Sequence, residues 1–226
     1  MSDKLPIVKS SQELANKLTP TSTLLGRGLA AIQQSQVAIV DQNERYRRAR
    51  AIFDHIAGDT WYEFNSEFGN PKSGNPAELQ SCLAIFQSLA DQGYGKAYFP
   101  LSVIYKLGHV ELKNEILATH YAYLGFDWCL ANQSSDDPEI WSDLGVMYYW
   151  GEVVNEDQSL AYSFLLKAAV ENNAQAQYFL GELYWAGKGV EKDYPEAIFW
   201  YGKSVAQEHL NFNIFVDLLA RFEAET

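Results

Sequence analysis

Apolar residues recur at helical spacing in the C-terminal part of the chain. In the segment 174–187 (AQAQYFLGELYWAG) they form one stripe, made of Ala176, Leu180, Leu183 and Tyr184. Gly187 follows, and glycine ends helices because it adopts a positive φ without steric cost. Asp193 can then cap a second helix with Pro195 in its first turn. The segment predicts two helices joined by a short turn.

The same pattern occurs earlier in the chain. Residues 143–170 and 179–206 align at an offset of 36, with eight identities in 28 positions: Leu144/Leu180, Gly145/Gly181, Tyr148/Tyr184, Gly151/Gly187, Val154/Val190, Asp157/Asp193, Ala161/Ala197 and Lys167/Lys203. A further copy aligns at an offset of 43, and its seven extra residues fall in the loop-like NQSSDDP of 132–138. Segment 81–97 resembles 161–177. Such periodicity predicts stacked helix pairs.

Small residues recur at fixed places in these units. Alanine occupies the second helix at Ala118, Ala161 and Ala197, and glycine lies within the first helix at Gly145 and Gly181. A mid-helix glycine costs about 1 kcal/mol relative to alanine. Its recurrence predicts close contact between neighbouring helices.

The order A-x-x-x-L-G-x-x-Y-x-x-G-x-x-V-x-x-D-x-x-x-A, seen from Ala176 to Ala197, resembles the Sel-one-like repeat family, a relative of the tetratricopeptide repeats. Two positions depart from the family pattern: Ser102 replaces the mid-helix glycine and Asn114 the capping aspartate. The resemblance implies an all-α fold, an α-solenoid of stacked antiparallel helix pairs (a TPR-like α-α superhelix).

We divide the chain into three parts. Residues 1–20 are expected to form a flexible arm, and 21–76 a helical hairpin with its connection. Residues 77–226 hold the repeats, and the apolar positions of 210–226 predict a capping helix at their end.

The charge disfavours nucleic acid and anionic membrane surfaces as partners, because the net charge is -12 and the isoelectric point is near 4.7. Residues 1–50 carry a net +4, however, and end in a basic cluster of Arg45, Arg47, Arg48 and Arg50. This cluster either meets an acidic or nucleic-acid partner or forms a solvated face paired with Asp41, Glu44 and Asp54.

No motif predicts catalysis, a metal or a cofactor. The four histidines lie outside any HExxH or Cys/His array, and neither a Walker loop nor G-x-S-x-G occurs. Cys82 and Cys129 are expected to be small core residues. Two cysteines, a polar N-terminus and no long apolar run favour a cytoplasmic, bacterial protein without a membrane span.

Several side chains of the first helices are left over once the structural positions are removed. In proteins that this chain resembles, first helices line the concave face. The candidates for a partner-binding groove are Tyr98, Phe99, Val103, Trp141, Val146, Tyr149, Trp150, Tyr178, Glu182 and Trp185. The rival interpretation is that they pack between repeats.

The sequence therefore predicts a non-enzymatic adaptor that binds a peptide or protein partner. A small-molecule-binding or hydrolytic enzyme on the same scaffold is the alternative, and the oligomeric state stays open.

Overall fold

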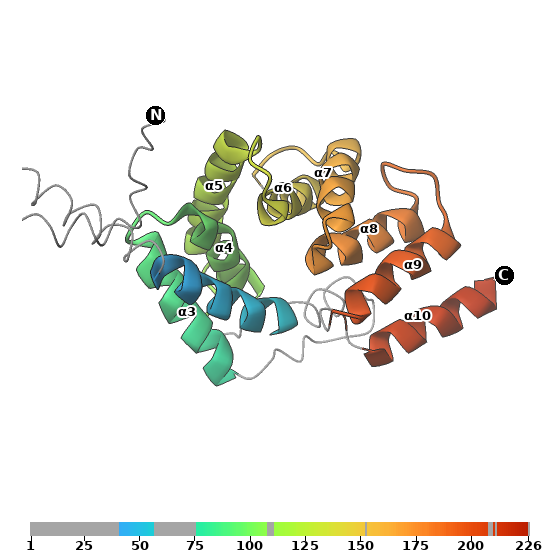
Figure 1. The fold of residues 1–226 in the computed structure, drawn as a ribbon, viewed down its shortest axis with the longest axis horizontal. Helices are drawn as coiled ribbons and strands as arrows, with labels where there is room; N and C mark the ends of the chain where they lie inside the picture. The colour runs from blue at the N-terminus through green and yellow to red at the C-terminus, as the bar shows by residue number, and fades with distance from the viewer. Residues whose placement is uncertain are drawn as a thin grey trace, which may run out of the picture. The chain divides into compact units, whose positions relative to one another are not determined.

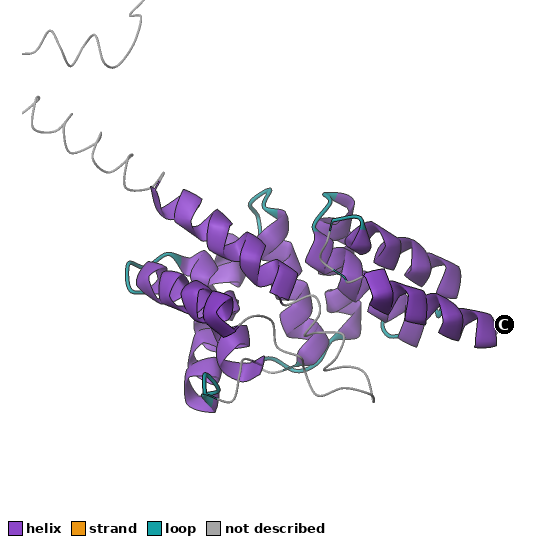
Figure 2. Cartoon of the chain, turned by 90° about the horizontal axis from the view of Figure 1, so that it is seen from below, coloured by secondary structure: helices purple, strands orange, loops and turns teal. Residues whose placement is uncertain are grey.

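The computed structural model describes residues 41–56, 76–107, 111–151, 153–207, 210 and 212–225. The chain divides into two compact units, residues 1–45 and 46–226, and every contact reported below lies within the second. All regular elements in the described ranges are helices (Figure 2). The predicted arm at 1–20 and most of the region 21–76 lie outside those ranges.

Successive helices pack as pairs, which confirms the predicted α-solenoid of helix pairs (Figure 1). The first and second helices of the three pairs are α4 (Tyr98–Leu107) with α5 (Glu115–Asn132), α6 (Pro138–Trp150) with α7 (Gln158–Val170), and α8 (Ala174–Ala186) with α9 (Tyr194–Val205). Before them come α3 (Pro76–Ala90) and a 3₁₀ turn (Gly95–Ala97), and α10 (Phe212–Glu225) follows as the expected last helix.

A helix over residues 41–56 packs on α3 through aromatic side chains. The rings of Tyr46 and Phe53 each lie 5.9 Å from the ring of Phe86. The thiol of Cys82 donates to the carbonyl of Ala49 at 3.5 Å, and both cysteines of the chain are buried and unpaired. This helix therefore belongs to the same core as the repeats.

The helix ends follow the sequence prediction. Gly151 and Gly187 have φ of 66° and 68°, and their N–H groups donate to the carbonyls of Met147 and Leu183. Asp157 and Asp193 cap α7 and α9 through their carboxylates. Asn114 caps α5 in the same way, accepting from Leu117 N at 3.0 Å, so the asparagine retains the role of the family's aspartate. Gly108, the equivalent of Gly151 at the repeat offset of 43, is expected to end the preceding first helix and lies outside the described residues.

The small residues mark the close approaches that the repeat predicts. A Cβ added at Gly145 would lie 2.6 Å from Leu165 Cγ, and one at Gly181 would lie 2.6 Å from a ring carbon of Tyr201. Ala161 and Ala197 have no exposed surface. Each first helix therefore packs tightly on the second helix of its own pair.

Ala161→Leu is expected to lower the free energy of unfolding by about 1–3 kcal/mol, because three added carbons must fit into a filled helix crossing. Chemical denaturation measured beside Ala131→Leu, an exposed position of α5, separates overpacking from the change of residue type. Equal denaturation midpoints for wild type and Ala161→Leu would show that Ala161 does not lie in a filled helix crossing.

Candidate functional site

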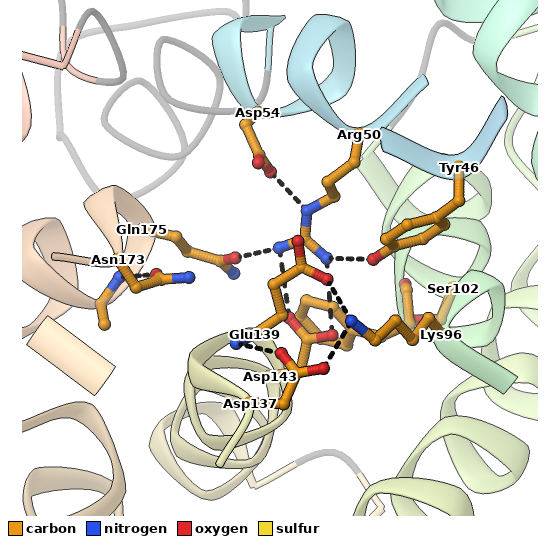
Figure 3. Close-up of polar contacts among 12 residues, drawn as sticks. Tyr46, Arg50, Asp54, Lys96, Ser102, Asp137, Glu139, Asp143, Asn173 and Gln175 are labelled. Atoms are coloured by element: carbon orange, nitrogen blue, oxygen red, sulfur yellow. Dashed lines mark hydrogen bonds and ion pairs between the residues drawn. The ribbon is translucent and has the colours of Figure 1, made fainter. Parts of the chain in front are cut away.

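A buried polar cluster joins the 41–56 helix to the first helices of the repeats (Figure 3). At its centre is Arg50, which is 3% exposed. Its Nε donates to Asp54 at 2.7 Å. One terminal nitrogen donates to Asp143 at 3.2 Å and to Gln175 at 2.5 Å. The other terminal nitrogen donates to the Tyr46 hydroxyl at 3.3 Å. One guanidinium thus connects its own helix with α6 and α8.

Lys96 extends this cluster toward α4. Its ammonium lies 2.5 Å from Asp137 and 3.1 Å from Glu139 at the start of α6. Lys96, Glu139 and Gln175 are equivalent positions of three successive units, separated by 43 and 36 residues like the repeats themselves. Arg50 of the 41–56 helix therefore contacts polar side chains of α6 and α8, and Lys96, just before α4, lies 5.7 Å from the ring of Tyr46 on the same helix.

Burial determines the electrostatics of this cluster. It raises the pKa of Asp143 to about 7 and also raises the pKa of Asp54, although Arg50 opposes both shifts. Burial alone would lower the pKa of Arg50, but the carboxylates of Asp54 and Asp143 outweigh it and hold the pKa above its usual value. Arg50 therefore stays charged and neutralises acids that would otherwise be costly to bury.

Both perturbed carboxyls are paired with Arg50, and that of Asp143 is only 4% exposed. A pocket among the described residues lies elsewhere, between α4, α5 and α6, and is lined by Phe99, Ser102, Val103, Lys106, Ala122, Met147, Trp150 and Val153. Its lining is mainly apolar, with Lys106 its one titratable side chain. The hydrolytic alternative thus gains no support from either feature.

The prediction of an exposed basic patch is wrong for Arg50. Its side chain is buried because it pairs with Asp54 of the next helical turn and with Asp143 of α6. Arg47 and Arg48 are exposed and Arg45 is half-buried. Arg50 is therefore paired within the chain, which was the other interpretation of this cluster.

Half of the ten groove candidates lie in the core. The rival interpretation, packing between helices, describes Phe99, Val103, Trp141, Val146 and Tyr178, each no more than 4% exposed. These five are removed from the candidates, because almost none of their surface can meet a partner. Half-buried positions are occupied by Tyr98, Tyr149, Trp150, Glu182 and Trp185.

Four of these half-buried residues lie on α6 and α8, and we call them the aromatic face: Tyr149, Trp150, Glu182 and Trp185. The rings of Tyr149 and Trp150 lie 5.2 Å and 6.0 Å from Phe179 of the following repeat. Tyr98 lies apart from them on α4, stacked on Tyr121 at 6.3 Å.

Cationic side chains of the chain itself cover the rings of the aromatic face. The Lys188 ammonium lies 5.7 Å from the Tyr149 ring centroid, the Arg221 guanidinium lies 5.7 Å from Trp185, and the Lys106 ammonium lies 5.2 Å from Trp150. The spacing of the first helices did not reveal Lys188 and Arg221, because Lys188 comes from a turn and Arg221 from α10.

Glu182 is the acidic member of the aromatic face. Its carboxylate accepts a hydrogen bond from the Tyr201 hydroxyl at 2.6 Å. Burial raises the pKa of Glu182, while the Tyr201 hydrogen bond and the charges of Arg221 and Lys188 oppose that rise. The two cations that cover Tyr149 and Trp185 therefore also act on this carboxylate.

Comparison with protein families matches the Sel1 repeat at residues 142–172 and 174–209. The chain therefore contains two Sel1 repeats. The two matched Sel1 repeats contain most of α6 and all of α7, α8 and α9, and thus all four residues of the aromatic face.

Three solved structures of repeat proteins are similar to the chain. A Sel1 repeat protein from Oxalobacter formigenes is 28% identical, with 55% of this chain and 90% of that one covered and a TM-score of 0.39. A protective antigen of uropathogenic Escherichia coli with an SLR fold is 24% identical (74% and 33% covered, TM-score 0.38). Helicobacter pylori cysteine rich protein B is 20% identical (59% and 92% covered, TM-score 0.34). Comparison with curated proteins finds no match.

No cluster of three or more His, Cys, Asp or Glu side chains in the described ranges could hold a metal ion. None of the helices described here combines the length and apolar character needed to cross a membrane.

Proposed function

We propose that this protein is a non-enzymatic scaffold that binds a peptide or protein partner on the aromatic face. Sel1 repeat proteins are generally scaffolds for protein interactions. A cytoplasmic, bacterial setting, expected from the sequence, is part of this proposal.

The observation that carries the proposal is the arrangement of aromatic side chains across two repeats. Tyr149 and Trp150 end α6 and rest on Phe179 of α8, while Trp185 lies near the end of α8. All three residues are half-buried, so the surrounding helices hold them while part of each residue stays exposed. Tyrosine and tryptophan held in this way are frequent hot spots of protein interfaces.

Replacing Tyr149, Trp150 and Trp185 together with alanine is expected to reduce partner recovery at least tenfold, since each hot-spot residue typically contributes about 1–2 kcal/mol or more. Affinity purification with the full chain, identification of the partner by mass and titration with purified partner measure the effect. Circular dichroism checks that helical content is unchanged.

Tyr123→Ala and Phe199→Ala are the matched controls, because both rings are exposed on second helices, at 52% and 53%. Recovery that survives the triple substitution, or that is lost equally in the controls, would eliminate the aromatic face as the binding surface.

A further inference from the structure

The repeat-containing unit is strongly acidic. Residues 46–226 contain 12 Lys and Arg against 25 Asp and Glu. Such a surface attracts cationic partners and repels anionic ones. The net charge alone, however, does not show where on the surface a cationic partner would bind.

Glu182 provides such a position. Its carboxylate accepts from the Tyr201 hydroxyl and also interacts with the Tyr178 side chain, whereas an ionised carboxylate can accept about four hydrogen bonds. The side chain is half-buried, which strengthens its interaction with a cation compared with an exposed acid. Glu182 is thus an acid with remaining acceptor capacity.

Two aromatic rings complete this position, Tyr149 on α6 and Trp185 on α8, the helix of Glu182. Burial raises the pKa of the Tyr149 phenol, and the charge of Glu182 raises it further. Trp185 follows three residues later on α8, and its ring lies 6.4 Å from the ring of Tyr201, the residue that donates to Glu182. A carboxylate near aromatic rings favours cations by both its charge and the ring quadrupoles.

The chain itself demonstrates this preference. Lys188 lies over Tyr149 and Arg221 over Trp185, each at 5.7 Å, and both cations also act on Glu182. Two cations that arrive from separate elements, the turn after α8 and the helix α10, therefore converge on one acid and its two rings.

We propose, on the basis of the scaffold function above, that Glu182, Tyr149 and Trp185 form a subsite for a basic side chain of the partner, and that Arg221 occupies this subsite in the free protein. Arginine is the better ligand, because its planar guanidinium stacks on a ring and donates in parallel to a carboxylate. The partner segment is therefore a basic peptide that displaces Arg221.

Calorimetric titration of the full chain with acetylated tetra-arginine amide, at about 0.15 M salt to screen long-range attraction, tests the subsite. Glu182→Gln is expected to weaken binding about tenfold, as loss of a charge-assisted hydrogen bond does. Arg221→Gln is expected to tighten binding several-fold, because it removes the internal competitor. Tetra-citrulline, which has nearly the same shape without the charge, is expected not to bind.

Glu171→Gln is the control, because it makes the same charge change at an exposed residue after α7. Equal weakening in Glu171→Gln and Glu182→Gln would reduce the effect to general attraction and overturn the subsite. Binding of tetra-citrulline, or weaker binding by Arg221→Gln, would overturn it as well. Glutamine can still accept from Tyr201, and circular dichroism verifies the fold of each variant.

The scaffold function and the subsite can fail separately. If the purified partner binds wild type and Glu182→Gln equally, the subsite is wrong and the scaffold stands. If tetra-arginine binding behaves as expected but the triple alanine variant retains its partner, the aromatic face is not the partner surface, and the three residues bind cations without taking part in partner recognition.

Discussion

Replacing Arg50 with methionine lowers the free energy of unfolding by about 3–5 kcal/mol at pH 8, the usual result of removing one partner from a buried ion pair. The side chains of Arg50 and Asp143 are only 3% and 4% exposed. Without the guanidinium, Asp143 and Asp54 lose their positive partner and Gln175 loses its hydrogen-bond donor. Denaturant midpoints at pH 8 measure the loss.

The loss shrinks as the pH is lowered. Burial already raises the pKa of Asp143 to about 7, and removing Arg50 raises it further. The folded variant therefore binds a proton more tightly than the unfolded chain, so its stability falls as pH rises from about 4 through the raised pKa. At pH 5 Asp143 is neutral in the variant, and the difference from wild type is smaller than at pH 8.

Two further variants distinguish the effect of removing a buried charge from the effect of changing arginine to methionine. Arg47→Met changes an exposed arginine of the same helix, and it stays within about 0.5 kcal/mol of wild type. The double variant Arg50→Met/Asp143→Leu recovers much of the loss, because apolar groups can replace a buried pair. A wild-type midpoint for Arg50→Met at pH 8 would contradict a structural role of the cluster.

The features that the sequence predicts well are those determined within one repeat. Gly151, Gly187, Asp157 and Asp193 act over a few residues of chain, and their turns and caps are present as predicted. Pairing of Arg50 with Asp54 is similarly local, four residues along one helix. Such signals are readable because the interacting groups share one helix or one turn.

The long-range polar contacts were not predictable in the same way. Arg50 reaches Asp143 and Gln175 over 93 and 125 residues, and no spacing rule links an arginine before the repeats with particular helices in them. One signal was available: Lys96, Glu139 and Gln175 repeat a polar residue at the start of each first helix. A recurring polar position of this kind indicates something polar that lies across the repeats.

The candidate site was predicted only in part. Helical spacing shows which residues share one face of a helix, but it does not show which of them are covered by neighbouring elements. Val146 and Glu182 are equivalent positions of successive repeats, yet Val146 is fully buried while Glu182 is half-buried. The covering elements decide this difference, and they lie at other places in the chain. The rings that remain on the aromatic face depend on such a neighbour, Phe179.

Phe179→Ala is expected to lower the free energy of unfolding by about 3–5 kcal/mol, since deletion of a buried phenyl ring combines lost transfer energy with a cavity. Phe179 has no exposed surface, and its ring lies 5.1–6.0 Å from those of Tyr178, Tyr149 and Trp150.

Because Tyr149 and Trp150 rest on this ring, Phe179→Ala also weakens partner binding under conditions where the variant stays folded. Phe199→Ala makes the same substitution at a 53% exposed ring of α9, and stays within about 0.5 kcal/mol of wild type. Denaturant midpoints and partner titration measure both effects. Full partner affinity in a folded but destabilised Phe179→Ala would mean that Phe179 supports the core alone, and that Tyr149 and Trp150 do not depend on it for their binding geometry.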